Sequence, residues 1–141
     1  MAIIKTGSAK WQGEIKTGKG EVSTESGALK SQPYGFATRF EGQPGTNPEE
    51  LIGAAHAACF SMALSKQLAD AGVTDVTIDT TSAVTLDKKG EGFGVTKVHL
   101  TTTVSGQGDE AKIREAAQKA KEGCPISQLL NAEITMDLTV A

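Results

Sequence analysis

Aromatic side chains and blocks of like charge are both scarce in this chain. Of its 141 residues, 4% are aromatic and 38% are hydrophobic, so small aliphatic side chains must supply much of the core. The 14 basic and 17 acidic residues are interleaved and leave a formal net charge of −3. Because no cluster of cations is available to hold a phosphate backbone, we do not expect nucleic acid as a partner.

A long uninterrupted hydrophobic run is also missing. Residues 1–7 contain no hydrophobic region of the kind found in a signal peptide, and the most apolar stretch, residues 51–64, is interrupted by His56 and Ser61. The sequence has no internal repeat and no low-complexity linker. It therefore predicts a single cytoplasmic domain over residues 1–141 that is not inserted in a membrane.

Cysteine occurs only twice, as Cys59 and Cys124. The two lie too far apart in the sequence for a CxxC motif, and neither is surrounded by the spacing of metal ligands. In a reducing cytoplasm, such cysteines are free thiols or a pair that cycles between thiols and a disulfide, rather than a permanent cross-link. Any pairing between them depends on the tertiary fold, so their reactivity is the central question.

The first third of the chain predicts strands. Alternation over residues 9–15, a glycine-containing turn at residues 17–20 and a β-prone segment at residues 21–24 indicate a hairpin. Alternation also predicts a strand over residues 36–40, with Arg39 on the opposite face from its aromatic neighbours.

A long helix is predicted next. Asn47 suits the N-cap, Pro48 suits the first helical position, Glu50 completes a capping-box spacing, and Gly72 is placed to end the helix. Because residues 51–64 are apolar nearly all round, we expect this helix to be covered on several sides, in part by another subunit. Six small residues would allow another backbone to approach closely: Gly53, Ala54, Ala55, Ala57, Ala58 and Ala63.

The second half predicts a mixed pattern of strands and helices. Residues 74–86 and 94–104 are β-prone segments on either side of a turn, and residues 132–140 alternate as a last strand. Between them, residues 109–122 carry apolar side chains at helical spacing. Because the strands do not alternate regularly with helices, the pattern predicts an α+β fold with antiparallel pairing.

Cys59 is the candidate nucleophile, and Arg39 is the candidate that activates it. Only the thiolate of a cysteine is reactive, and a neighbouring cation favours that form. Arg39 could hold a thiolate and a substrate oxygen with its planar guanidinium, or it could be an ordinary surface residue. Glu50 could orient Arg39 through a bidentate contact, or it could serve only as a helix cap.

Helix geometry limits how these groups can meet. Glu50 lies nine residues before Cys59, which corresponds to about 13 Å along a straight helix and about half a turn out of phase. Either the helix is broken near Gly53, or Arg39 and Glu50 approach the Cys59 of another subunit. We favour the second arrangement, because the apolar helix already requires a partner.

Cys124 precedes Pro125 and is predicted to be the N-cap of a short helix that runs through Leu130. The helix dipole would then help to stabilise its thiolate, although an isolated buried cysteine is more often a packing residue.

The two histidines have weaker signals. His56, three residues before Cys59, could act as a base or join Cys59, His99 and Cys124 in a metal site. A structural histidine with satisfied hydrogen bonds is the favoured interpretation, because neither histidine lies in a ligand motif.

Several motifs together resemble the OsmC/Ohr family from end to end. The two cysteine motifs are the most specific, since each cysteine stands in a distinctive local sequence. The matching segments are residues 47–51, 54–60 and 123–127, with Trp11 and residues 23–27, 32–36 and 39–42.

The resemblance implies an intertwined α+β homodimer with antiparallel sheets around long central helices. It also implies a thiol-dependent antioxidant peroxidase that acts on organic hydroperoxides and less well on hydrogen peroxide. Cys59 would be oxidised to a sulfenic acid, Cys124 would close a disulfide with it, and Arg39 and Glu50 would assist. No metal or other cofactor is implied, and an external dithiol of lipoyl or thioredoxin type would restore the thiols.

Two interpretations compete with the enzyme. A stress protein could bind a hydrophobic ligand or sense oxidation, and a purely structural protein would carry cysteines of ordinary reactivity. For the enzyme, apolar side chains around the site would suit an alkyl or lipid hydroperoxide, and the expected lining residues are Leu51, Phe60 and Met62.

Overall fold

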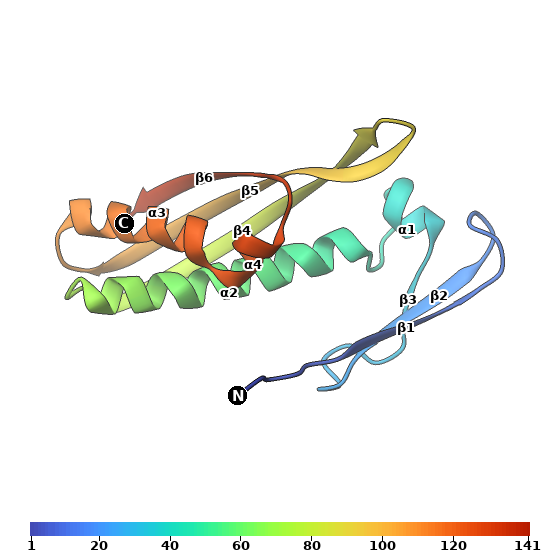
Figure 1. The fold of residues 1–141 in the computed structure, drawn as a ribbon, viewed down its shortest axis with the longest axis horizontal. Coiled ribbons are helices and arrows are strands. Elements are labelled where there is room, and N and C mark those ends of the chain that lie inside the picture. Colours follow the sequence, from blue (N-terminus) through green and yellow to red (C-terminus); the bar gives the residue numbers. More distant parts are fainter. The chain divides into compact units, whose positions relative to one another are not determined.

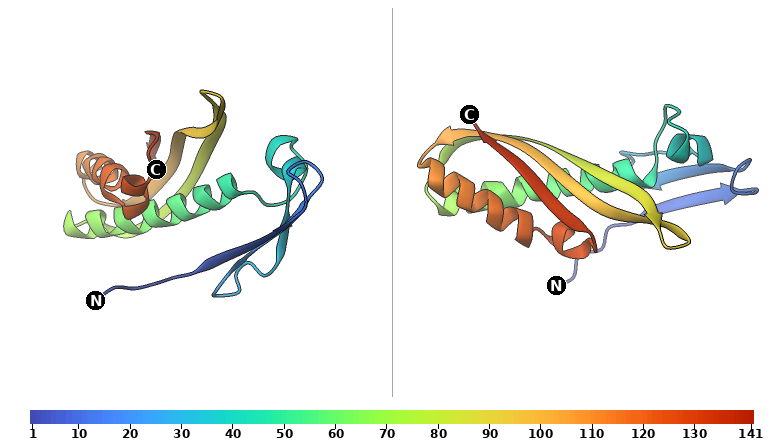
Figure 2. Two further views of the ribbon diagram at one scale, coloured as in Figure 1. Left: turned by 45° about the vertical axis from the view of Figure 1, so that its right-hand side comes forward. Right: turned by 90° about the horizontal axis from the view of Figure 1, so that it is seen from above.

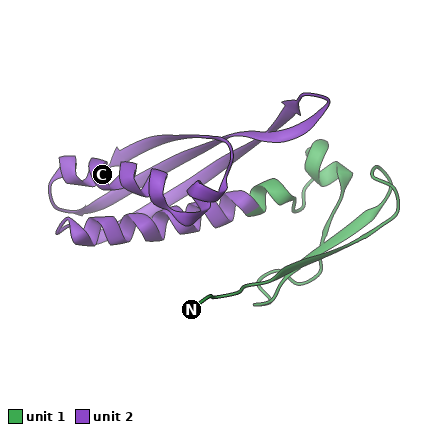
Figure 3. Ribbon diagram, viewed as in Figure 1, with its two compact units in different colours: residues 1–51 green, residues 52–141 purple.

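The computed structural model describes all 141 residues and divides them into two compact units, residues 1–51 and residues 52–141 (Figure 3). Each unit contains its own three-stranded sheet, and four helices lie along the chain (Figure 1). None of these helices is both long and apolar enough to cross a membrane.

The sheet of residues 1–51 begins with the predicted hairpin. Strands β1 (Gly7–Gln12) and β2 (Lys19–Thr24) are antiparallel, and the loop between them is longer than the predicted turn. A short third strand that the sequence pattern did not predict, β3 (Gln32–Tyr34), pairs with β2. The rings of Trp11 and Tyr34 meet over Gly20, where an added Cβ would lie 2.7 Å from Trp11 and 2.6 Å from Tyr34. This aromatic contact therefore requires glycine at position 20.

Residues 36–40 form a helix, α1 (Phe36–Phe40), so the predicted strand is wrong. Thr38 closes the first turn, because its Oγ1 accepts a hydrogen bond from the Gly35 N–H and donates one to the Gly35 carbonyl, both at 3.0 Å. The rings of Phe36 and Phe40 then lie 4.8 Å apart on one side of the turn. Two aromatic residues four positions apart fit either a strand or a helix, so alternation over five residues could not decide between them.

Helix α2 (Pro48–Asp70) begins and ends as predicted. Asn47 caps its start, since the side-chain Oδ1 accepts a hydrogen bond of 2.8 Å from the Glu50 N–H. Gly72 follows its end with a φ of +78°, a conformation that favours glycine. The helix continues without interruption through Gly53, so the predicted alternative of a broken helix is wrong.

The sheet of residues 52–141 combines two kinds of pairing. Strands β4 (Thr74–Lys89) and β5 (Gly92–Gln107) form the predicted antiparallel hairpin. Strand β6 (Glu133–Val140) pairs with β5 in parallel, which corrects the expectation of antiparallel pairing throughout. The reason is the crossover through α3 (Glu110–Gly123) and α4 (Pro125–Leu129), which returns the chain in the direction of β5.

The helices of residues 52–141 share one face of this sheet (Figure 2). Alternate residues of β5 are buried beneath them, which leaves His99 on the opposite face. Helix α2 buries a single stripe, formed by Gly53, His56, Phe60, Leu64 and Leu68.

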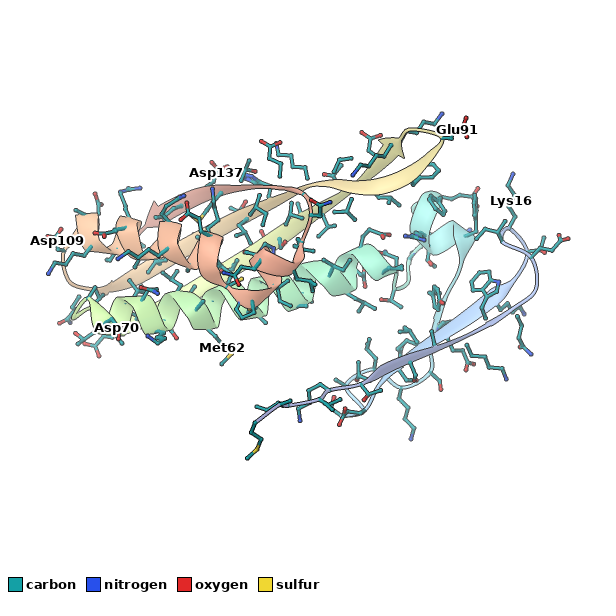
Figure 4. All side chains as sticks on the ribbon, in the orientation of Figure 1. Lys16, Met62, Asp70, Glu91, Asp109 and Asp137 are labelled. Atoms are coloured by element: carbon teal, nitrogen blue, oxygen red, sulfur yellow. The ribbon has the colours of Figure 1, made fainter.

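The rest of α2 is not covered within this chain, so the predicted burial on several sides depends on the expected second subunit, which stays a prediction. Ala54, Ala55 and Ala58 are exposed, and Met62, at 75% exposure, projects away from the helix (Figure 4). Gly53 does allow a close approach, but to the backbone of its own β4 rather than to another subunit, since an added Cβ would lie 2.8 Å from the Ser82 carbonyl oxygen.

This contact yields a stability prediction. Gly53→Ala should lower the free energy of unfolding by about 1–3 kcal/mol, because a backbone oxygen cannot move aside cheaply. The loss should occur even though alanine favours a helix by about 1 kcal/mol. Gly123→Ala is the matched control, since an added Cβ at the end of α3 meets no atom within 4 Å. Urea unfolding followed by circular dichroism measures both, and equal midpoints for the two variants would contradict the prediction.

Candidate active site

The fold brings the two free cysteines together. Cys59 lies on α2 and is half-buried, whereas Cys124, at the start of α4, is only 1% exposed. The Cys59 thiol has two polar neighbours, the thiol of Cys124 and the backbone N–H of Ile126. The pairing that the sequence left to the tertiary fold is therefore present as two adjacent thiols.

Cys124 is the N-cap of α4, as predicted. Its Sγ accepts a hydrogen bond of 3.3 Å from the Ser127 N–H, and its thiol donates to the Ser127 Oγ over 3.2 Å. Pro125 occupies the first turn, and Leu130 caps the end of the helix. The cap fixes the position of the Cys124 sulfur, because the cysteine is held by both the backbone and the side chain of Ser127.

Burial dominates the electrostatics of Cys59. It raises the pKa of the Cys59 thiol, the backbone N–H of Ile126 lowers that pKa, and the Cys124 thiol raises it. None of these influences is a cationic side chain. Nucleophilic chemistry at Cys59 would require a thiolate. Because no cation is among the groups that shift the Cys59 pKa, such a thiolate would need a cation from elsewhere.

His56 is fully buried and makes two side-chain contacts. Its Nε2 lies 2.7 Å from the Ser127 Oγ, and its Nδ1 lies 3.4 Å from the Ser82 Oγ. Burial lowers the pKa of His56 and so favours the neutral imidazole. Both ring nitrogens therefore have partners, as the interpretation favoured from the sequence requires.

The metal alternative does not fit the arrangement. His99 lies on the other face of the sheet, where its Nε2 is 3.0 Å from the Asp137 Oδ2. His99 is therefore separated from His56 and the two cysteines, and no group of three or more His, Cys, Asp or Glu side chains is arranged to hold a metal ion.

Within residues 1–51, Arg39 pairs with Glu49 and not with Glu50. The Nε and Nη2 of Arg39 donate to the two carboxylate oxygens of Glu49, each over 2.9 Å. These hydrogen bonds raise the pKa of Arg39 and keep it charged. Glu50 is exposed, and its backbone N–H bonds to Asn47 at the start of the helix, so of its two possible roles the contact with Arg39 does not form within this chain.

The local structure explains the shift by one residue. Arg39 lies on a helical turn, with its guanidinium 5.4 Å from the centre of the Phe40 ring, so it does not point away from its aromatic neighbours as the strand prediction required. Successive residues of a helix differ in direction by about 100°, and only one of two adjacent glutamates can face a given group. The pair Glu49 and Glu50 could not be resolved from the sequence alone.

One cavity lies beside the Cys59 thiol, and a separate one lies beside Arg39. An open cleft of about 930 Å³ reaches Cys59, and Met62 lines it together with Ile126. A separate cavity of about 260 Å³ reaches Arg39; its other lining residues are mostly aromatic or apolar, namely Trp11, Ile15, Tyr34, Gly35, Phe36 and Phe40. Of the predicted lining residues, Met62 is beside Cys59, and Leu51 lines another cavity within residues 1–51. Phe60 is fully buried in the core, so its assignment to the lining is wrong.

The mixed α/β fold and the adjacent free thiols define a small protein with a dithiol site. The sequence model of the family described as OsmC-like protein matches residues 40–139. The chain is 62% identical to "Peroxiredoxin OsmC" of Escherichia coli (strain K12), over 97% of this chain and 96% of that protein. It is 31% identical to "Organic hydroperoxide resistance protein OhrB" of Bacillus subtilis (strain 168), over 84% of this chain and 87% of that protein.

Comparison with solved structures agrees. The crystal structure of OhrB of Bacillus subtilis superposes with a TM-score of 0.70 at 26% identity, over 95% of this chain and 98% of that one. The chain belongs to the OsmC/Ohr family.

The sequence analysis missed two residues of the site: Glu49, which holds Arg39, and Ser127, which contacts Cys124. Glu49 was hidden by its neighbour Glu50. Ser127 follows Cys124 by three positions. An N-cap side chain commonly accepts a hydrogen bond from the backbone N–H three positions later, so this spacing could have indicated the contact.

Proposed function

We propose that this chain is a thiol-dependent peroxidase that reduces organic hydroperoxides, and hydrogen peroxide less well. The observation that carries the proposal is the adjacency of two free thiols, one at an open cleft and one buried beside it. The names of the relatives, a peroxiredoxin and an organic hydroperoxide resistance protein, support the same chemistry. Free cysteines also fit a reducing cytoplasm.

In this mechanism the Cys59 thiolate attacks one peroxide oxygen. The O–O bond breaks, the alcohol leaves after taking up a proton, and Cys59 becomes a sulfenic acid. Cys124 then attacks the Cys59 sulfur, and water leaves as the disulfide forms. An external dithiol of lipoyl or thioredoxin type reduces the disulfide by exchange, and no metal or other cofactor takes part.

Arg39 supplies the cation that Cys59 lacks. Glu49 engages Nε and Nη2, which leaves Nη1 outside the ion pair and able to face a thiolate and the peroxide oxygens. The largely apolar and aromatic cavity beside Arg39 suits the organic part of a hydroperoxide. We assign Arg39 to the partner subunit of a homodimer, which also provides cover for the exposed apolar residues of α2.

Steady-state turnover tests the function. With a dithiol reductant, the protein should consume cumene hydroperoxide faster than hydrogen peroxide. Cys59→Ser should abolish turnover, because the nucleophile is lost, and Cys124→Ser should stall after one oxidation. A wild-type protein that shows no turnover of either peroxide would refute the proposal and favour ligand binding.

The ion pair offers a matched test on adjacent glutamates. Glu49→Gln should lower kcat/KM by about 10- to 100-fold, because a misplaced guanidinium no longer meets the reacting oxygens. Glu50→Gln should change kcat/KM by less than about 3-fold, since the Glu50 side chain is solvent-exposed. The same peroxide assay compares the two, and an equal loss in both variants would argue against the role of Glu49.

Mixed dimers test the source of Arg39. Arg39→Ala and Cys59→Ser chains should each be inactive alone. Random mixing makes about half of the dimers mixed, each with one complete site, so activity should recover to about one quarter of the wild-type value. Failure to recover, in mixtures whose heterodimers are verified by mass spectrometry, would place Arg39 and Cys59 in the same subunit.

A further inference from the structure

Cys124, Ser127 and His56 form a buried series of hydrogen-bonded side chains. The Cys124 thiol donates to the Ser127 Oγ over 3.2 Å, and that oxygen lies 2.7 Å from the His56 Nε2. The three residues come from two elements, α2 and the start of α4, and their exposed fractions are 1% for Cys124, 6% for Ser127 and 0% for His56. Water has almost no access to these groups.

The hydrogen-bond directions agree along the whole chain. If His56 carries its proton on Nδ1, that nitrogen donates to the Ser82 Oγ at 3.4 Å, and Nε2 is left as an acceptor. Ser127 then donates to Nε2 and accepts from the Cys124 thiol. Each of the three side chains thus donates one hydrogen bond and accepts one, and the series ends at the unprotonated Nε2 of His56.

No other charge acts on this nitrogen. The two side chains that contact the His56 ring, Ser127 from α4 and Ser82 from β4, are both uncharged. His56 and Cys124 are the only buried titratable side chains, and the half-buried Cys59 neighbours Cys124. Burial alone lowers the pKa of His56, so the imidazole is neutral and its Nε2 lone pair is available to the Ser127 hydroxyl.

We propose that Ser127 and His56 form a proton relay that deprotonates Cys124 as it closes the disulfide with Cys59. The inference rests on the proposed function and assigns roles to two residues in its second step. Ser127 touches the reacting sulfur, whereas His56 acts through Ser127 by orienting its hydroxyl and taking its proton.

The step balances as follows. The Cys124 proton passes to the Ser127 Oγ while the Ser127 proton passes to the His56 Nε2. The Cys124 sulfur forms a bond to the Cys59 sulfur and is oxidised, the S–O bond of the sulfenic acid breaks, and its sulfur is reduced. The oxygen leaves as hydroxide, which takes a proton from solvent to become water, and His56 later returns its proton to solvent. The sum is one sulfenic acid and one thiol giving one disulfide and one water.

A buried thiol needs such a base more than an exposed one. Solvent cannot readily take the proton of Cys124, and a thiolate formed in advance would be disfavoured in the core. Transfer of the proton during the attack avoids a separate buried anion. General-base assistance of this kind contributes about 100- to 10,000-fold in other enzymes.

A single-turnover experiment separates this step from the first oxidation. The reduced protein is mixed with one equivalent of cumene hydroperoxide and no reductant, and samples are quenched for sulfenic acid and for disulfide by mass spectrometry. In Ser127→Ala and His56→Gln, sulfenic acid should form at the wild-type rate, and the disulfide should form about 10- to 100-fold more slowly. Glutamine can still accept the Ser127 hydrogen bond but is not basic, so His56→Gln removes the base and keeps the contact.

The pH profile distinguishes a relay from a structural role. Above about pH 6.5 the wild-type rate of disulfide formation should be nearly flat, because His56 is neutral there. In Ser127→Ala the thiol must ionise beforehand, so the rate should rise about 10-fold per pH unit through neutrality. Ser61→Ala is the control, since it removes a different serine hydroxyl, which is half-buried on α2 and donates to Thr80 rather than to the relay. It should keep the wild-type rate and profile.

Each outcome decides the matter. Wild-type rates of disulfide formation in Ser127→Ala, or slow rates with an unchanged pH profile, would overturn the relay while leaving the peroxidase intact. Absence of both sulfenic acid and disulfide in the wild-type protein would overturn the proposed function itself, and the relay with it. Ser127→Ala carries the test if His56→Gln does not fold, and Ser127→Thr, which restores a hydroxyl, should recover the rate.

Discussion

The close packing of α2 on β4 is the constraint on which the site depends. Helix α2 approaches the strand at Gly53, where there is no side chain to hold the Ser82 carbonyl away. From that point the buried stripe of α2 continues through His56 and Phe60 to the end of the helix. Cys59 falls at the edge of this stripe, so it is half-buried and reaches both the interior and the open cleft. The position of the thiol is thus a consequence of helix packing.

The start of α4 completes the site from the other side. A cysteine as N-cap is held by its own helix, and here the sulfur bonds to both the N–H and the hydroxyl of Ser127. The same hydroxyl meets His56 from α2, so one serine joins the cap of one helix to the buried stripe of another. Local capping and tertiary packing therefore act on the same atoms, which gives the buried thiol a defined direction and a polar path for its proton.

The two cysteines differ in what surrounds them. Cys59 is next to a cleft, and burial and the second thiol raise its pKa with only the Ile126 N–H acting against them. Arg39, with its charge held by Glu49, lies in the other unit of the chain and has the cation that Cys59 lacks. In the proposed mechanism the nucleophile and its cation belong to separate units of the chain, so reactivity would depend on assembly, and the uncovered apolar residues of α2 fit the proposed homodimer.

Much of the architecture followed from local chemistry in the sequence. Asn47 and Gly72 mark the ends of α2, and Cys124 followed by Pro125 marks the start of α4, because capping depends on residues a few positions apart. The candidate cysteines and Arg39 were also evident from the sequence, through their rarity and the family motifs. Tertiary structure alone decided the rest: that residues 36–40 are helical, that β6 runs parallel to β5, that Glu49 and not Glu50 holds Arg39, and that Ser127 links Cys124 to His56. The parallel pairing and the contact with His56 depend on residues distant in the sequence, and the choice of glutamate depends on which of two adjacent side chains faces Arg39. Residues 36–40 were misassigned because alternation over five residues fits both a strand and a helix.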